Sequence, residues 1–311
     1  MTDGDRVHLD ERTSSWLTDV LGRQRIVAAR SLSGGFRNHN VRLVTDIGEE
    51  YVLRRFLHDN TCAVETALAE RLTGVVPVAE VLADDPDGAL TGRPAMLSRF
   101  VPGVLLTEAL PASAETHQLG HAVGAILAAI GTVTFAQPGF FTSVLVPDGT
   151  DTTTQLPAFV ERCLAEGNAD QAFSAGELDA LRQHAADQAA LLTPLRGARQ
   201  LVHSDFNPKN LLVARRDGTW VVTAVLDWEF AFAGAPLVDV GNMLRFQDEI
   251  PPDFADGFIA GFAAAGGDLP EDWRPVSQAL DLFALADFLT RPPGNPFFGK
   301  AVAVIRRQLQ T

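Results

Sequence analysis

A short segment in the second half of the chain has the residue types and spacing that phosphoryl transfer requires. Residues 201–213 contain His203, Asp205 and Asn210 in the pattern H-x-D-x-x-x-x-N, followed by an apolar run. A carboxylate can accept or orient the proton of an attacking hydroxyl, and a nearby amide oxygen can bind the Mg²⁺ that neutralises phosphate charge. We expect Asp205 to be the catalytic base and Asn210 a metal ligand.

A second acidic motif follows the next apolar run. Asp227, Trp228 and Glu229 come directly after residues 220–226, which are typical of a strand. A carboxylate at the end of that strand could supply the second metal ligand, as the aspartate of the D-F-G motif does in protein kinases. We therefore predict Asp227 as a Mg²⁺ ligand, and we place Trp228 and Glu229 at the acceptor site. Taken singly, Asp205 or Asn207 could be a turn residue before Pro208, and Asp227 could be an ordinary strand-end residue.

The first hundred residues contain candidates for binding a nucleotide. Gly34 and Gly35 could let the backbone approach phosphates closely, although an ordinary turn has the same composition. Arg54 ends a β-prone run and could bind phosphates through its planar fork, held by Glu65 or by Glu70 on the next helix. Residues 95–101 are expected to offer backbone groups to a purine edge. The expected nucleotide contacts are Gly34, Gly35, Asn38, Arg54, Glu65, Met96, Ser98 and Phe100.

The elements that must position these residues follow from hydrophobic periodicity. Short β-prone runs, with one helix among them, predict a small β-rich unit before Pro102 and Gly103, and the glycine pair is expected to precede its first strand. Apolar residues at helical spacing predict a larger, mostly helical unit after it. Strands are expected at 41–44, 50–56, 78–83, 95–101, 211–214 and 220–226, a loop at 137–154, and helices at 61–72, 117–133, 156–166, 175–192, 237–246, 253–265, 274–290 and 300–310.

These motifs resemble the aminoglycoside phosphotransferase and choline kinase-like superfamily, which shares the protein kinase fold. The parallel extends from about residue 32 to 246, with Ser204 in place of the usual glycine of H-G-D and Arg54 in place of the usual lysine. The resemblance implies an α+β, two-lobed fold, with a β-rich nucleotide-binding lobe at 1–101 and a helical catalytic lobe at 102–311. It also implies Asp205 as base, Asn210 and Asp227 as metal ligands, Arg54 and Glu65 as the phosphate-binding pair, and His203 and Asp239 as supports of the catalytic loop.

Composition limits the partners and the location of the chain. The 311 residues carry 25 Lys and Arg against 39 Asp and Glu, a net charge of −14 that disfavours nucleic acid. No apolar stretch approaches about 18 residues and the polar start lacks a signal peptide, so no membrane is expected and the cytoplasm is the predicted location. Cys62 and Cys163 are expected to be small buried residues rather than a disulfide.

The sequence thus predicts an enzyme that uses ATP or GTP with Mg²⁺ to phosphorylate a hydroxyl of a small molecule. The acidic balance and Glu229 favour a cationic acceptor, while a neutral metabolite such as homoserine or a sugar is also open. A catalytically silent nucleotide-binding module is the alternative from another class, because Arg54 departs from the family pattern. His117 and His121 have a spacing that could bind zinc, but solvent-facing histidines are favoured because no glutamate follows His117.

Overall fold

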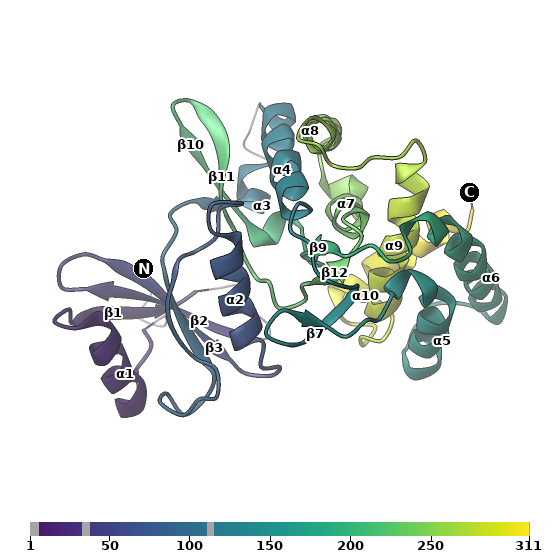
Figure 1. Ribbon diagram of the computed structural model, residues 1–311. Helices are drawn as coiled ribbons and strands as arrows, with labels where there is room; N and C mark the ends of the chain where they lie inside the picture. Colours follow the sequence, from purple (N-terminus) through teal and green to yellow (C-terminus); the bar gives the residue numbers. More distant parts are fainter. Residues whose placement is uncertain (1–5, 33–37, 111–114, 311) are drawn as a thin grey trace.

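The computed structural model describes residues 6–32, 38–110 and 115–310 (Figure 1). The first part is a five-stranded antiparallel sheet in the order β1-β2-β3-β5-β4, with one helix before it and one between β3 and β4. Its elements are α1 (Glu11–Leu21), β1 (Ile26–Ser31), β2 (Asn38–Thr45), β3 (Glu50–Phe56), α2 (Cys62–Leu72), β4 (Val81–Asp85) and β5 (Ala95–Arg99). We call this part the N-terminal lobe.

The rest of the chain, which we call the C-terminal lobe, is mostly helical (Figure 1). It is joined to β5 through residues 100–103. Its helices are α3 (Leu106–Ala109), α4 (Thr116–Ile130), α5 (Leu156–Glu166), α6 (Ala175–Leu191), α7 (Leu237–Leu244), α8 (Pro252–Ala264), α9 (Trp273–Phe288) and α10 (Pro296–Gln308). Its strands are β6 (Val104–Leu105), β7 (Gly139–Ser143), β8 (Val146–Pro147), β9 (Gln200–Val202), β10 (Leu211–Arg216), β11 (Thr219–Val225) and β12 (Phe232–Gly234).

Two small sheets in the C-terminal lobe position the residues that the sequence singled out for catalysis and metal binding. Strands β11, β10 and β6 form one sheet, and β8, β7, β12 and β9 form the other. The segment after β9 carries Asp205, and the segment after β11 carries Asp227. The strands expected at 211–214 and 220–226 form the β10–β11 hairpin, so the predicted position of Asp227 at the end of a strand is confirmed, as is that of the Asp205 segment before one. Strand β9, which precedes Asp205, was not predicted.

The N-terminal lobe differs from the expectation at its beginning. Helix α1 and strand β1 were not predicted, and the glycine pair therefore follows the first strand rather than preceding it. Strand β1 lies at the sheet edge and buries only Ala29, which explains its weak alternation of apolar residues. Helix α1 does carry a start signal, because the Asp10 side chain accepts a hydrogen bond from the Thr13 amide at 2.9 Å. Trp16 and Leu17 of this helix pack against the sheet.

Three other expectations about the elements also need correction. The predicted loop at 137–154 contains the β7–β8 hairpin and a 3-10 helix at Thr152–Thr154. A strand was expected at 78–83, but β4 begins at Val81 and continues to Asp85. The buried Asp85 carboxylate accepts hydrogen bonds from the Leu90 and Thr91 amides, which fixes the turn after the strand. Helix α10 begins four residues earlier than predicted, with Asn295 as its N-cap. Cys62 and Cys163 are buried free thiols, as expected.

No helix within the described residues is both long and apolar enough to cross a membrane. The core of the C-terminal lobe is one large apolar cluster, which also takes in Leu68 and Leu72 of α2. Helix α2 therefore belongs to the N-terminal lobe by sequence but is anchored in the core of the C-terminal lobe.

Helices α4 and α8 cross at backbone contact. A Cβ atom added at Gly120, Gly124, Gly257 or Gly261 would lie only 2.0–2.2 Å from a carbonyl oxygen of the facing helix. Such a distance is far below van der Waals contact, so these four positions admit no side chain unless the helices separate. The crossing fixes α4 against the rest of the helical lobe.

We predict that Gly124→Ala lowers the free energy of unfolding by about 1–3 kcal/mol, because the methyl group would overpack the crossing. Gly176→Ala is the matched control, since Gly176 lies in α6 with no atom within 4 Å of an added Cβ. There the better helix propensity of alanine should leave stability unchanged or raise it by up to about 1 kcal/mol. Urea denaturation of both variants measures the difference, and equal stabilities would contradict the close crossing.

Candidate active site

The Asp205 carboxylate is held by two amide side chains. Its Oδ1 accepts a hydrogen bond from Asn207 Nδ2 at 2.7 Å, and its Oδ2 accepts one from Asn210 Nδ2 at 2.7 Å. Asn210 Nδ2 also donates to the Asp205 carbonyl at 2.9 Å. Burial raises the pKa of Asp205, while the two amides and the nearby Arg245 lower it. The result is a fixed and partly desolvated carboxylate, which is what a general base for a hydroxyl requires.

His203 connects the two loops that carry Asp205 and Asp227. The buried ring has Nε2 2.8 Å from the Leu226 carbonyl and Nδ1 3.2 Å from the Asp205 amide. Since the carbonyl only accepts and the amide only donates, Nε2 carries the proton and Nδ1 accepts. Burial lowers the pKa of His203 to about 4, so the ring is neutral at pH 7.

Asp239 holds the backbone of the loop that carries Asp205. Its two carboxylate oxygens accept hydrogen bonds from the amides of His203 and Ser204 at 2.7 and 2.8 Å. Ser204 has a φ of 69°, a left-handed conformation that glycine adopts more easily. The Ser204 carbonyl also accepts a hydrogen bond from Asn242 at 2.7 Å, so contacts on both sides of the residue hold the strained backbone. Burial raises the pKa of Asp239 to about 7 against the opposing effect of these amides.

Arg54 joins the N-terminal lobe to the second loop. Its Nη2 donates to Glu65 Oε1 at 3.3 Å and to Asp227 Oδ1 at 2.5 Å. Of the two acidic partners considered from the sequence, Glu65 is therefore the one in contact, while Glu70 is exposed. Burial raises the pKa of Glu65 to about 7, although Arg54 pulls it down.

The predicted metal ligands offer the donor set that Mg²⁺ prefers. Asn210 Nδ2 donates to both the carbonyl and the carboxylate of Asp205, so Oδ1 is the Asn210 atom that could bind a metal. Carboxylate oxygens of Glu65, Asp227 and Glu229 lie within 4.8 Å of one another. Amide and carboxylate oxygens are hard ligands suited to Mg²⁺, so these residues fit the metal that the fold implies.

Asn38 and Glu229 make a second contact between the lobes. Asn38 Nδ2, at the start of β2, donates to Glu229 Oε2 at 2.8 Å. Glu229 Oε2 is also 3.7 Å from Arg54 Nη2. Glu229 thus contacts two residues that are expected to bind the nucleotide, although the sequence analysis placed Glu229 at the acceptor site.

The remaining predicted residues have varied placements. Gly34 and Gly35 lie outside the described residues. Met96 and Ser98 lie within β5, which pairs with β3 on one side and with β4 on the other. Pairing within the sheet therefore uses the backbone groups that were expected to face a purine. The Phe100 amide donates to the Glu50 carbonyl at 3.1 Å.

Trp228, expected to contact the acceptor, is instead a packing residue in this structure. Its indole N–H donates to the Val225 carbonyl at 3.2 Å, and its ring lies 4.5 Å from the ring of His203. With 5% of its surface exposed, it supports the His203 ring from one side.

Two residues that hold the site were not singled out from the sequence. One is Asn207, whose position two residues after Asp205 is typical of a side chain that bonds back to its own loop. Asn242 lies one turn after Asp239 on the same helix, and nothing in the sequence alone connects it with Ser204.

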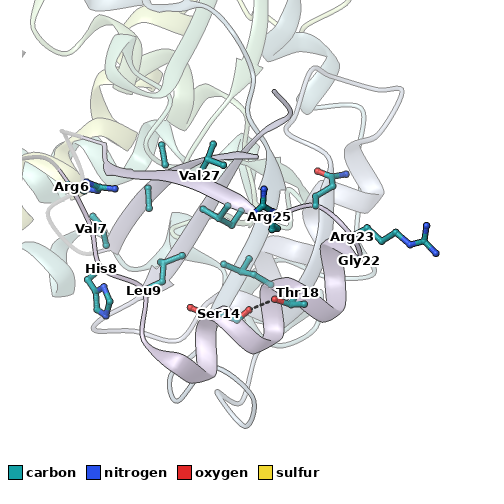
Figure 2. Close-up of a pocket in the computed structure, with 15 residues that line it drawn as sticks. Arg6, Val7, His8, Leu9, Ser14, Thr18, Gly22, Arg23, Arg25 and Val27 are labelled. Atoms are coloured by element: carbon teal, nitrogen blue, oxygen red, sulfur yellow. Dashed lines mark hydrogen bonds between the residues drawn. The ribbon is translucent and has the colours of Figure 1, made fainter. Parts of the chain in front are cut away.

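A surface pocket of about 420 Å³ lies away from these residues, between the first described residues, α1 and β1 (Figure 2). Fifteen residues between Arg6 and Ala29 line it, and none of them belongs to the predicted site. Figure 2 shows the Arg23 side chain pointing away from the pocket, and Arg25 is paired with Asp46. His117 and His121 are exposed on α4, apart from the carboxylate cluster described above.

Comparison with known families agrees with this geometry. The model of the phosphotransferase enzyme family matches residues 28–277, which is most of the chain and includes every residue of the site. The chain belongs to this family. It is a phosphotransferase with a hydroxyl acceptor, and the resemblance drawn from its motifs is confirmed.

Solved structures show the same fold at low sequence identity. The aminoglycoside phosphotransferase APH(4)-Ia superimposes with a TM-score of 0.72 at 18% identity, over 96% of this chain and 98% of the other. A thermostable mutant of it, in complex with ADP and hygromycin B, gives 0.71 at 18% identity over 96% and 97%. The streptomycin-ATP-APH(2")-IIa complex gives 0.63 at 14% identity over 97% of both chains. The two-lobed α+β fold is therefore confirmed. No significant match was found among curated proteins.

We predict that His203→Gln removes part of the acid sensitivity of the fold. Because the pKa is about 4 in the folded state against 6.5 for a free histidine, the unfolded chain binds more protons between these values. The stabilisation of the fold by neutral His203 is fully present above about pH 6.5. It is lost as the pH falls toward 4, and the total loss in unfolding free energy is about 3 kcal/mol.

Glutamine can reproduce both hydrogen bonds but does not titrate. The difference in unfolding free energy between wild type and His203→Gln should therefore shrink by that amount over the window, measured by urea denaturation at several pH values. A difference that stays constant with pH would mean that His203 is not a buried neutral ring.

Proposed function

We propose that this phosphotransferase transfers the γ-phosphoryl group of ATP to a hydroxyl of a small molecule, with Asp205 as the base. The arrangement of Asp205, fixed by two amides beside an amide and carboxylate set suited to Mg²⁺, is the observation that carries the proposal. ATP is supported by the ADP and ATP complexes of structures with this fold. GTP remains the alternative expected from the sequence.

The proposed reaction forms one bond and breaks one. The acceptor oxygen bonds to the γ-phosphorus while the bond from that phosphorus to the β–γ bridging oxygen breaks, which releases ADP. Asp205 orients the hydroxyl and takes its proton, and burial makes this carboxylate a stronger base than one in water. Bound Mg²⁺, held by Asn210 and Asp227, would neutralise the charge of the phosphates.

Arg54 is the residue proposed to hold the phosphates. Its side chain is buried, and its Nε has no hydrogen-bond partner among the described residues. A buried guanidinium N–H without an acceptor is costly, and a phosphate oxygen is the acceptor that this geometry suits best. The purine edge is proposed to meet the backbone between Phe100 and Gly103, where the chain leaves the sheet.

The acceptor is proposed only as a small hydroxyl compound. Structures with this fold have been solved in complex with hygromycin B and with streptomycin, which supports a small-molecule acceptor. Glu229 was one reason to favour a cationic acceptor, but it is engaged with Asn38 and Arg54. Radiolabelled transfer from ATP and from GTP to aminoglycosides, peptide and macrolide antibiotics, choline, homoserine and sugars identifies both the acceptor and the nucleotide.

We predict that Asp205→Ala lowers the rate of transfer by about 10²–10⁴-fold, because the acceptor hydroxyl loses its base. Binding of a non-hydrolysable ATP analogue with Mg²⁺, measured by calorimetry, should change little. Asp179→Ala is the control, since Asp179 is an exposed carboxylate on α6. Transfer at the wild-type rate by Asp205→Ala would refute the assignment of the base.

A further inference from the structure

One nitrogen of Arg54 lies among three carboxylates. Nη2 is 2.5 Å from Asp227 Oδ1, 3.3 Å from Glu65 Oε1 and 3.7 Å from Glu229 Oε2. Glu65 comes from α2, and the two other acids come from the loop after β11. The guanidinium is therefore a shared counterion for acids of both lobes.

The same three side chains have the arrangement of a divalent cation site. Their carboxylate oxygens lie within 4.8 Å of one another, and they are the one such group found among the described residues. The side chains of Glu65 and Glu229 are 5% and 10% exposed, so water screens their charges poorly. Three carboxylates this close together require a positive charge between them, and the Arg54 guanidinium provides it.

The guanidinium has bonding capacity left for a second anion. Its Nε is buried and has no partner within the described part of the chain. Arg54 is 8% exposed, so this N–H cannot be satisfied by bulk water. The planar fork of arginine allows Nε to bind a phosphate oxygen in a way that the single point charge of lysine does not.

We propose that Arg54 is a built-in substitute for a divalent metal: it offsets part of the negative charge of Glu65, Asp227 and Glu229 and excludes the metal until nucleotide phosphates draw the guanidinium away. The inference rests on the proposed function, because it requires a nucleotide to supply those phosphates. While Nη2 holds Asp227 Oδ1, that oxygen cannot bind a metal. Metal and nucleotide would then enter together, and the enzyme would not hold metal alone.

The test is the metal dependence of Arg54→Met without nucleotide. Methionine keeps much of the side-chain volume but leaves three carboxylates without a counterion. In EDTA we expect the melting temperature of the variant to fall below that of wild type, because an ion-paired cluster has lost its cation. Millimolar Mn²⁺ should raise it again by at least about 3 °C, while wild type should respond little.

Direct Mn²⁺ binding, followed by the electron paramagnetic resonance signal of free Mn²⁺, should be at least about tenfold tighter in Arg54→Met than in wild type. Arg55→Met is the matched control, because Arg55 is the next residue on β3 but pairs with Asp10. It should show the wild-type response to Mn²⁺. Equal Mn²⁺ affinity of Arg54→Met and wild type would overturn the proposal.

If Arg54→Met does not fold, Arg54→Lys decides the question. Lysine carries the same charge but lacks the fork and places its nitrogen differently, so it should hold the three carboxylates less closely and show Mn²⁺ binding tighter than wild type. Affinity equal to wild type in this variant would also overturn the proposal. These measurements contain no phosphoryl transfer, so failure of the proposed function, seen as no transfer to any acceptor, is recognised separately.

Discussion

The neutral imidazole of His203 is the interaction on which the arrangement of the site depends. One ring nitrogen accepts from the amide of Asp205 and the other donates to the carbonyl that precedes Asp227. The two loops leave different sheets, and the ring sets the spacing between them. A protonated ring would lose the first contact and would place a charge in a fully buried position, so the geometry requires the low pKa that burial produces.

A second constraint determines where the N-terminal lobe meets this centre. Helix α2 carries Glu65 in its first turn and inserts Leu68 and Leu72 into the core of the C-terminal lobe. Apolar packing thus fixes the acid that holds Arg54, while Arg54 itself belongs to the sheet of the other lobe. The ion pairs that Arg54 makes with acids of both lobes therefore depend on how the lobes pack, and so do the positions of the side chains proposed to bind phosphate and metal.

The loops that carry Asp205 and Asp227 could be predicted from the sequence, whereas the contacts that other parts of the chain make with them could not. Asp205, Asn210 and Asp227 could be proposed as site residues because their order and spacing match a chemical requirement within a short stretch of chain. The contact of Arg54 with Asp227 could not, because it joins residues 173 positions apart and depends on how the lobes meet. Trp228 was misplaced for a similar reason: its direction is set by the neighbouring His203 ring rather than by its own motif.

Elements with few buried residues were also missed. Strand β1 buries one side chain, and the β7–β8 hairpin lies in a segment rich in glycine, proline and threonine, so neither shows clear periodicity. The glycines of the α4–α8 crossing show a different limit of prediction from the sequence. Their positions are visible in the sequence, but only the facing helix explains why no side chain fits there.

The central claim is that the two loops converge on one phosphoryl centre. A crystal structure with Mn²⁺ and a non-hydrolysable ATP analogue tests it most directly, because anomalous scattering locates the metal. The account predicts a Mn²⁺ ion bound to Asn210 Oδ1 and to a carboxylate oxygen of Asp227, with the Asp205 carboxylate facing the terminal phosphate. A metal peak or a triphosphate end located away from these three side chains would contradict it.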